Sequence, residues 1–159
     1  VTLGDEYTGV VRCSPSGGGL YPVSLYFVAF NVEGLEQGIY VYLPLMHAIR
    51  LVRKLDRREM DEYDRISNFG INIENDTLGI AIYYVYSLYD NSRKYGDMAM
   101  QFAYIEAGEI AENIQLTATA LNLAATDIGG YEKGLTEAFL GLDGLTKHIL
   151  HLTLVGTAK

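Results

Sequence analysis

The sequence predicts an α+β domain built on a mostly antiparallel sheet. Apolar segments rich in β-branched and aromatic residues recur at strand length, and one much longer segment has helical spacing. These segments do not alternate regularly as strand, helix and strand, which a parallel sheet would require. With 159 residues, 49% of them hydrophobic, the chain is long enough to bury a core. Residues 1–159 are therefore predicted to form a single domain.

The predicted strands are apolar runs bounded by Pro, Gly or polar turns. Residues 47–53 alternate apolar and polar side chains, which is typical of the return arm of a hairpin with one wet face. The run "TLGIAIYYVY" is the most strand-like in the chain and should be central in the sheet. A further short strand should end in a Gly-Gly turn. The complete set is 23–30, 38–43, 47–53, 77–86, 125–131 and 148–156.

Three segments favour helices, and residues 68–76 favour a loop. Residues 56–66 and 134–140 should form short helices, while apolar residues at steps of two to four predict one helix of about thirty residues over 94–123. Gly108 lies in the middle of that helix, where glycine costs about 1 kcal/mol relative to alanine. We therefore expect Gly108 to make a close contact with another helix or a ligand.

Charge and cysteine content exclude several classes of partner. The formal net charge of −8 leaves no basic surface for nucleic acid or an anionic membrane. The single Cys13 cannot form an intrachain disulfide, and no apolar run reaches membrane-spanning length. These features predict a cytoplasmic location and a small-molecule or protein partner. Because the chain begins at Val1, it is also expected to be a fragment.

The stretch "CSPSGGGLYP" places three glycines directly before a strand. It has neither the spacing of a dinucleotide-binding fingerprint nor the Gly-Lys-Ser/Thr of a P-loop. Its bare backbone could lie against a flat or anionic ligand. A glycine-rich turn without any ligand is an equally good interpretation.

Lys94 and Tyr95 open the predicted long helix, after a loop, "YDNSR", that leaves a strand. Such a pair is most often a surface charge next to a core anchor. At a strand end it can also serve as a proton donor and acceptor.

No metal site is predicted. His148 and His151 should lie on opposite faces of a strand. Glu106, Glu109 and Glu112 recur every three residues and favour an acidic helix face or a dimer-interface role over a metal site, because the partner Glu-x-x-His motifs of di-iron proteins are missing from the sequence. Cys13 is expected to be a small packed side chain.

Four segments, in this order, resemble the flavin-dependent nitroreductase superfamily over residues 12–156. They are "RCSPSGGGLYPVSLYFVAFNVEGLEQGIYVYLP", "RKYGDMAMQFAYIEAGEIAENIQLTATALNLAATDIGGY", "LGLDG" and "LTLVG". The branch that they resemble most is the SagB/McbC-type azoline dehydrogenases. The oxidase domains of nonribosomal peptide synthetases are also similar.

The resemblance implies an FMN-dependent nitroreductase-like fold, in which the long helix borders the flavin and builds a homodimer. The helix motif of the family matches Glu106, Ala107, Gly108 and Asn113, but Glu109 and Glu112 stand where relatives carry His and Gln. The family also has a glycine pair by the reactive edge of the flavin and a Pro-Ser-Gly loop against it, ending at Pro22. The cofactor-binding residues that the resemblance implies are Pro15, Ser16, Gly17, Gly18, Asn113, Ile128, Gly129 and Gly130.

In the azoline dehydrogenase branch a Lys-Tyr pair is functionally important, and it matches Lys94 and Tyr95. Relatives begin with an Arg-bearing helix that holds the FMN phosphate, and that helix would lie upstream of Val1. The chain is therefore expected to be an N-terminally incomplete copy. Arg12 and Lys159 could supply part of the phosphate charge.

The implied function is oxidation of peptide thiazolines or oxazolines to thiazoles or oxazoles, with FMN as the oxidant. The implied partners are an azoline-containing peptide, a second copy of the chain with FMN near the interface, and a cyclodehydratase complex. Two alternatives stay open: an NAD(P)H-dependent nitro or quinone reductase, and a non-catalytic scaffold subunit of a biosynthetic complex.

Overall fold

A computed structural model describes residues 12–67 and 77–157 of the chain. The predicted loop at 68–76 and Lys159 lie outside the described residues. The strands are β1 Val23–Ala29, β2 Gly38–Leu43, β3 Ala48–Lys54, β4 Leu78–Ser87, β5 Leu123–Asp127 and β6 Lys147–Thr157. The helices are α1 Arg57–Ser67, α2 Leu88–Tyr95, α3 Ala99–Ala120 and α4 Lys133–Phe139, with short 3-10 turns η1 Gly17–Gly19, η2 Pro44–Met46 and η3 Gly96–Met98.

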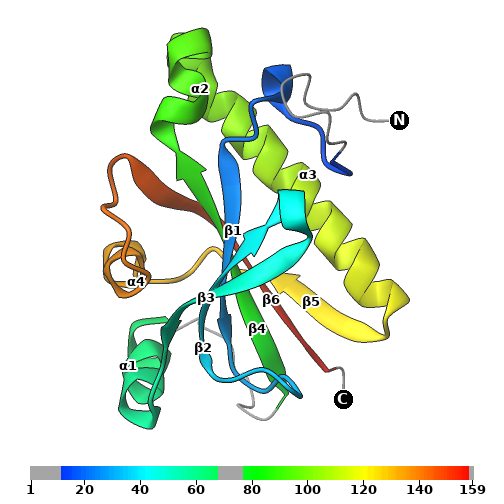
Figure 1. The fold of residues 1–159 in the computed structure, drawn as a ribbon, viewed down its shortest axis with the longest axis vertical. Coiled ribbons are helices and arrows are strands. Elements are labelled where there is room, and N and C mark those ends of the chain that lie inside the picture. The colour runs from blue at the N-terminus through cyan, green and yellow to red at the C-terminus, as the bar shows by residue number, and fades with distance from the viewer. Residues whose placement is uncertain (1–11, 68–76, 158–159) are drawn as a thin grey trace.

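One antiparallel sheet joins all six strands in the order β3-β2-β1-β4-β6-β5. Figure 1 shows α3 crossing one face of this sheet, with α1 and α4 on the other side. The α+β class, the antiparallel sheet and the central position of β4 are confirmed. The strand predicted at 125–131 begins and ends earlier, at Leu123 and Asp127.

The sheet separates two apolar cores, because successive side chains of a strand point to opposite faces. On β4, Tyr83 and Val85 pack with Tyr63 of α1, whereas Tyr84 and Tyr86 pack toward α3. The fully buried residues that α3 contributes to the second core are small, namely Ala103, Ala107, Ala111 and Ala118, while larger α3 side chains pack around them.

The helix predicted over 94–123 is two helices. Gly96 has φ +50° and ψ −126°, a conformation that favours glycine and ends α2. Two side-chain hydrogen bonds then orient α2, since the buried Tyr86 hydroxyl donates to Asn91 Oδ1 and Asn91 Nδ2 donates to the Ala99 carbonyl. The segment "YDNSR", predicted as a loop, therefore lies inside α2.

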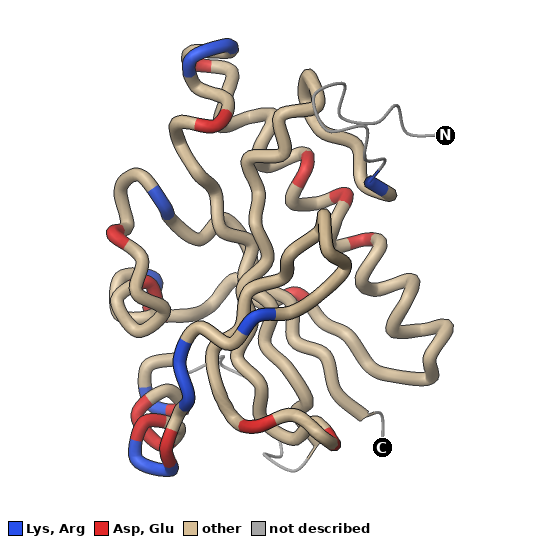
Figure 2. Tube along the Cα trace, viewed as in Figure 1, with Lys and Arg blue, Asp and Glu red and all other residues tan. Residues whose placement is uncertain are grey.

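Basic residues are concentrated on β3 and α1 (Figure 2). Acidic residues are interspersed among them, as in the contacts of Arg53 with Glu59 and of Lys54 Nζ with Glu36 at 2.6 Å. Within the described ranges, no helix is both long and apolar enough to cross a membrane. The basic residues of this region are Arg50, Arg53, Lys54, Arg57, Arg58 and Arg65.

Candidate functional site

The glycine loop is a tight, left-handed turn that leads into β1. Gly18 and Gly19 have φ of +65° and +68°, and Tyr21, which is not glycine, has φ +49°. The Ser16 carbonyl accepts the Gly19 N–H at 3.0 Å, and the Ser16 hydroxyl oxygen accepts the Tyr21 N–H at 2.8 Å. Ser16 therefore closes the turn from both its backbone and its side chain.

The glycines of the loop lie directly against α2 and α3. A Cβ placed on Gly17 would sit 3.2 Å from the Phe102 side chain, and one on Gly18 would sit 2.7 Å from Lys94 Nζ and overlap the Tyr95 hydroxyl. No side chain larger than hydrogen fits at Gly18 without displacing these groups. The structure thus brings the glycine loop and the Lys94-Tyr95 pair together, although about eighty residues separate them.

Lys94 and Tyr95 are the last two residues of α2, not the first residues of the long helix. The Tyr95 ring packs edge-on against Phe102 with ring centroids 4.8 Å apart, and Lys94 Nζ lies 5.3 Å from the Tyr95 ring centroid. Phe102 thereby fixes the Tyr95 ring, so the phenol and the ammonium both meet the backbone of Gly18.

Glu106 of α3 lies beneath the same loop and is only 2% exposed. Its Oε1 accepts the Val23 N–H at 3.3 Å. Burial raises the pKa of Glu106 to about 7, although the Ser16 hydroxyl, the Val23 amide and the charge of Arg12 oppose that shift. The predicted acidic face is wrong for this residue, since Glu106 points inward, Glu109 is half-buried and only Glu112 is exposed.

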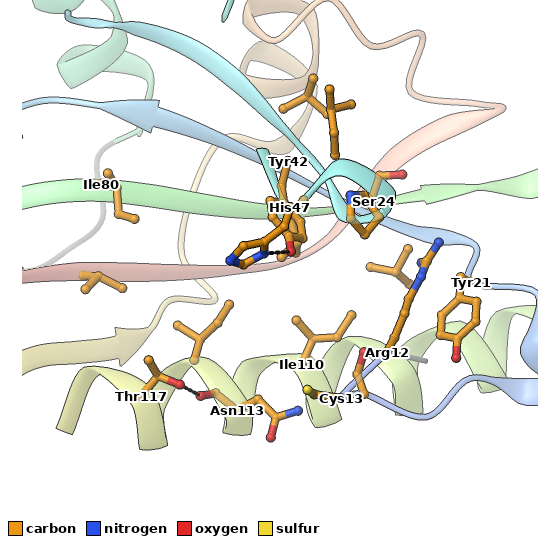
Figure 3. A pocket seen from close by; sticks show the side chains of 18 of the residues that line it. Arg12, Cys13, Tyr21, Ser24, Tyr42, His47, Ile80, Ile110, Asn113 and Thr117 are labelled. Atoms are coloured by element: carbon orange, nitrogen blue, oxygen red, sulfur yellow. Dashed lines mark hydrogen bonds between the residues drawn. The ribbon is translucent and has the colours of Figure 1, made fainter. Parts of the chain in front are cut away.

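Arg12 and Asn113 lie in a separate, largely apolar groove between α3 and the β2–β3 hairpin. The cavity has a volume of about 1070 Å³. Figure 3 shows Arg12 and Tyr21 at one end, Tyr42 and His47 on the hairpin wall, and Asn113 and Thr117 on the helix. The Arg12 guanidinium stacks over the Tyr21 ring at 3.8 Å. Arg12 therefore reaches the glycine loop as well as the groove.

Ile128, Gly129 and Gly130 follow β5. Ile128 is buried in the core on the α1 side, and its N–H donates to the Leu152 carbonyl at 2.9 Å. Gly129 and Gly130 are exposed, and a Cβ on either would meet no atom within 4 Å among the described residues. Their backbone is therefore open to a flat ligand. Cys13 and Pro15 lie at the start of the glycine loop and are both exposed, so the prediction of a packed Cys13 is wrong.

Asp127, which directly precedes this glycine pair, is the centre of a polar network that the sequence did not reveal. Its Oδ1 accepts the Thr153 hydroxyl at 2.6 Å and lies 3.2 Å from His151 Nε2, while its Oδ2 accepts Gln115 Nε2 at 2.7 Å. Because Thr153 donates to Asp127, it accepts from the Tyr84 hydroxyl at 2.8 Å. The partners come from three distant segments, so no local pattern could have identified them.

The prediction that His148 and His151 lie on opposite faces is wrong. The register of β6 shifts between Tyr84 and Val85 of β4, which leaves Leu150 as an extra residue. Both imidazoles therefore lie on the α3 face, where His148 packs against Tyr86 and His151 against Tyr84. The described residues nevertheless contain no group of three or more metal-ligating side chains.

An antiparallel sheet with a long helix on one face, an exposed glycine pair after β5 and a Lys-Tyr pair under a second glycine turn define an α+β enzyme-like scaffold. The chain belongs to the Nitroreductase family, since the sequence profile of that family matches residues 8–157. Proteins of this family typically bind a flavin, FMN.

Individual relatives agree with this assignment. MJ1384 of Methanocaldococcus jannaschii is named as a nitroreductase and is 34% identical to this chain over 119 residues. These residues are 74% of this chain and 57% of that protein. The chain thus spans little more than half the length of this curated relative.

Solved structures share the fold. A chain of the Escherichia coli microcin synthetase McbBCD complex, solved with truncated pro-MccB17 bound, superposes with a TM-score of 0.81 at 24% identity, covering 95% of this chain and 57% of that one. A protein of Anabaena variabilis that is named as a nitroreductase gives a TM-score of 0.78 at 23% identity, covering 93% of this chain and 30% of that one. A protein of Staphylococcus epidermidis named as an NAD(P)H:FMN oxidoreductase gives 0.60 at 14% identity, covering 91% and 70%.

Proposed function

We propose that this chain is the catalytic domain of an FMN-dependent azoline dehydrogenase, which oxidises thiazolines or oxazolines in a peptide to the aromatic azoles. The observation that carries the proposal is the packing of Lys94 and Tyr95 against Gly18. This contact brings the two proposed proton-transfer groups against the loop that we propose as one wall of the cofactor site. The likeness to a chain of a peptide-modifying synthetase supports the peptide substrate.

The reaction removes a proton from the azoline Cα and a hydride from the ring methylene. FMN, when bound, supplies the two-electron oxidant for this step. Lys94 and Tyr95 supply the proton acceptor, with Tyr95 held in place by Phe102. Lys94 Nζ lies 5.3 Å from the Tyr95 ring centroid, so one of the two side chains would be the base and the other would position it.

The exposed backbone of Gly129 and Gly130 fits one edge of a flat isoalloxazine ring, because nothing in the described chain fills the space beside it. The loop from Pro15 to Gly18 would form a second wall. Arg12 and Asn113 would contribute side chains from the adjoining groove. Lys159 stays a proposed contributor to the phosphate site.

A homodimer would use the outer face of α3. Tyr104, Ile105 and Leu116 are 54%, 58% and 59% exposed on this face, and Gly108 lies between them. Large exposed apolar side chains on one helix face are typical of an interface. A cyclodehydratase is the proposed second partner, since it would form the azoline.

The test compares the double variant Lys94→Ala, Tyr95→Phe with wild type on a peptide that contains a thiazoline. We expect azoline oxidation to fall at least about 100-fold, the usual contribution of a positioned acid or base. The FMN dissociation constant should change less than about threefold. Tyr89→Phe with Lys147→Ala, both exposed, is the matched control. Full azoline oxidation by a double variant that still binds FMN would disprove the catalytic assignment.

Assays on the wild-type protein distinguish the two alternative functions. The likeness to an NAD(P)H:FMN oxidoreductase favours a nicotinamide-dependent reductase as the second candidate. That enzyme would reduce small nitro or quinone acceptors with NAD(P)H and would not need Lys94. A scaffold subunit would retain no visible flavin absorbance after incubation with FMN and removal of the unbound flavin.

A further inference from the structure

Glu106 joins both ends of the glycine loop to α3. Its Oε1 accepts the N–H of Val23, where the loop enters β1, and the Ser16 hydroxyl at the start of the loop lies beside the same carboxyl. Ser16 in turn accepts the Tyr21 N–H. A single buried side chain of the helix therefore contacts the segment Ser16–Val23 at two points.

The second oxygen of this carboxyl, Oε2, is buried and has no hydrogen-bond partner among the described residues. An ionised carboxylate with an unsatisfied oxygen is very unfavourable when it is only 2% exposed. A proton on the carboxyl removes most of that penalty. When the loop lifts, water reaches the carboxyl and the ionised form becomes favourable again.

We infer that Glu106 is a proton-dependent latch that holds the segment Ser16–Val23 closed on α3 and thereby positions Gly18 against Lys94 and Tyr95. Glu106 is a positioning residue in this inference, because it acts on the site through the loop. The effect on the flavin site rests on the proposed function. The latch itself depends only on contacts within the chain.

The charged groups around Glu106 determine the direction of the effect. Arg12 favours the ionised form, as do the Ser16 hydroxyl and the Val23 amide, while Glu109 on the next turn of α3 disfavours it. Burial outweighs the first three and raises the pKa of the closed form to about 7, above the ordinary value of 4.5 for a glutamate. Protonation therefore stabilises the closed loop, and the closed loop loses stability as pH rises from about 4.5 to about 7, above which the carboxyl is ionised in both forms.

The backbone of the loop makes it sensitive to such a change. Tyr21, with φ +49°, occupies the left-handed region, which is unfavourable for any residue with a side chain. The loop is held in this conformation by its contacts with Ser16, Glu106 and Phe102. Weakening one of these contacts shifts the balance between closed and open loop.

The first measurement is hydrogen exchange at the Tyr21 and Val23 amides of the apo protein, corrected for the intrinsic pH dependence of exchange. In wild type we expect protection to fall more than about tenfold between pH 5 and pH 7, and to change little above pH 7. In Glu106→Gln, which has the same shape and no titration, protection should not change with pH. Glu112→Gln, an exposed glutamate of the same helix, should behave as wild type. Protection that is independent of pH in wild type would overturn the latch.

A gentler variant covers the case in which Glu106→Gln does not fold. Glu109→Gln removes the neighbouring negative charge that raises the pKa of Glu106. The midpoint of the loss of protection should therefore move to lower pH. A midpoint that stays in place or moves to higher pH would contradict the proposed cause.

The second measurement is the FMN dissociation constant at pH 6 and pH 8. Wild type should bind FMN several-fold more weakly at pH 8 than Glu106→Gln does, and the comparison cancels the titration of the FMN phosphate. If no variant binds FMN but the exchange results are as expected, the latch stands and the proposed function fails. If FMN binds with the same pH dependence in both proteins, the latch does not act on the site.

Discussion

Two kinds of glycine surround the proposed site, and they differ in what they face. Gly17 and Gly18 lie in a closed turn, and a side chain on either would press on Phe102, Lys94 or Tyr95. Gly129 and Gly130 lie in an exposed turn, where a Cβ would meet open space in the described chain. At Gly17 and Gly18, glycine is required because the chain's own side chains occupy the space that a Cβ would need. At Gly129 and Gly130, no packing contact among the described residues requires glycine.

This difference changes the interpretation of the glycine-rich loop. From the sequence, the loop and the later glycine pair both suggested close approach to a ligand. In the structure the close approach at Gly18 is to Lys94 and Tyr95. The exposed glycines after β5 are better placed for a molecule that does not belong to this chain.

The largest expected effect is that of Gly18→Ala. Alanine at φ +65° costs about 1–2 kcal/mol, and its Cβ also displaces the Tyr95 hydroxyl or Lys94 Nζ. We expect a total loss of about 2–4 kcal/mol in the free energy of unfolding, measured by urea denaturation. Gly17→Ala is the matched variant, since its φ is not left-handed, and it should lose less. Equal losses would show that the left-handed backbone is not the cause.

The fold could be predicted from the sequence where local patterns decide it. All six strands were found, because β-branched and aromatic runs bounded by turns determine them almost alone. The exceptions have distant causes. The helix α2 depends on the Tyr86–Asn91–Ala99 hydrogen bonds, and the bulge at Leu150 depends on the pairing of β6 with β4. Neither pairing can be read from one segment.

In the site, too, local patterns identified single motifs, whereas contacts between segments could not be predicted. The motif residues of the glycine loop and the Lys-Tyr pair were found separately, but their contact through Gly18 is a property of the fold. Glu106 was expected on an acidic face, because a period of three among glutamates is consistent with one side of a helix. Its burial is set by the loop above it, which the helix pattern does not contain.

A smaller effect of opposite sign is expected for Gly108→Ala. The sequence predicted a close contact of Gly108 with another helix or a ligand, and within the described chain a Cβ there would meet no atom within 4 Å. In a dilute, monomeric sample alanine should therefore raise the free energy of unfolding by about 1 kcal/mol, through helix propensity alone. If the proposed dimer uses this face, the added methyl group should weaken self-association in analytical ultracentrifugation. A loss of stability in the monomer would mean that Gly108, like Gly18, is packed against another part of the chain.

The smallest effect on stability is expected for Gly129→Ala. Because the added Cβ meets open space and φ is not left-handed, the free energy of unfolding should change by less than about 0.5 kcal/mol. If a flavin lies against this backbone, however, the methyl group occupies its place, and FMN affinity measured by fluorescence quenching should fall at least about tenfold, or about 1.4 kcal/mol. Gly134→Ala is the matched control, since Gly134 in α4 is equally open. Unchanged FMN affinity in Gly129→Ala would show that these glycines are open for some reason other than the cofactor, and the site would then have to be built from the Gly18 side alone.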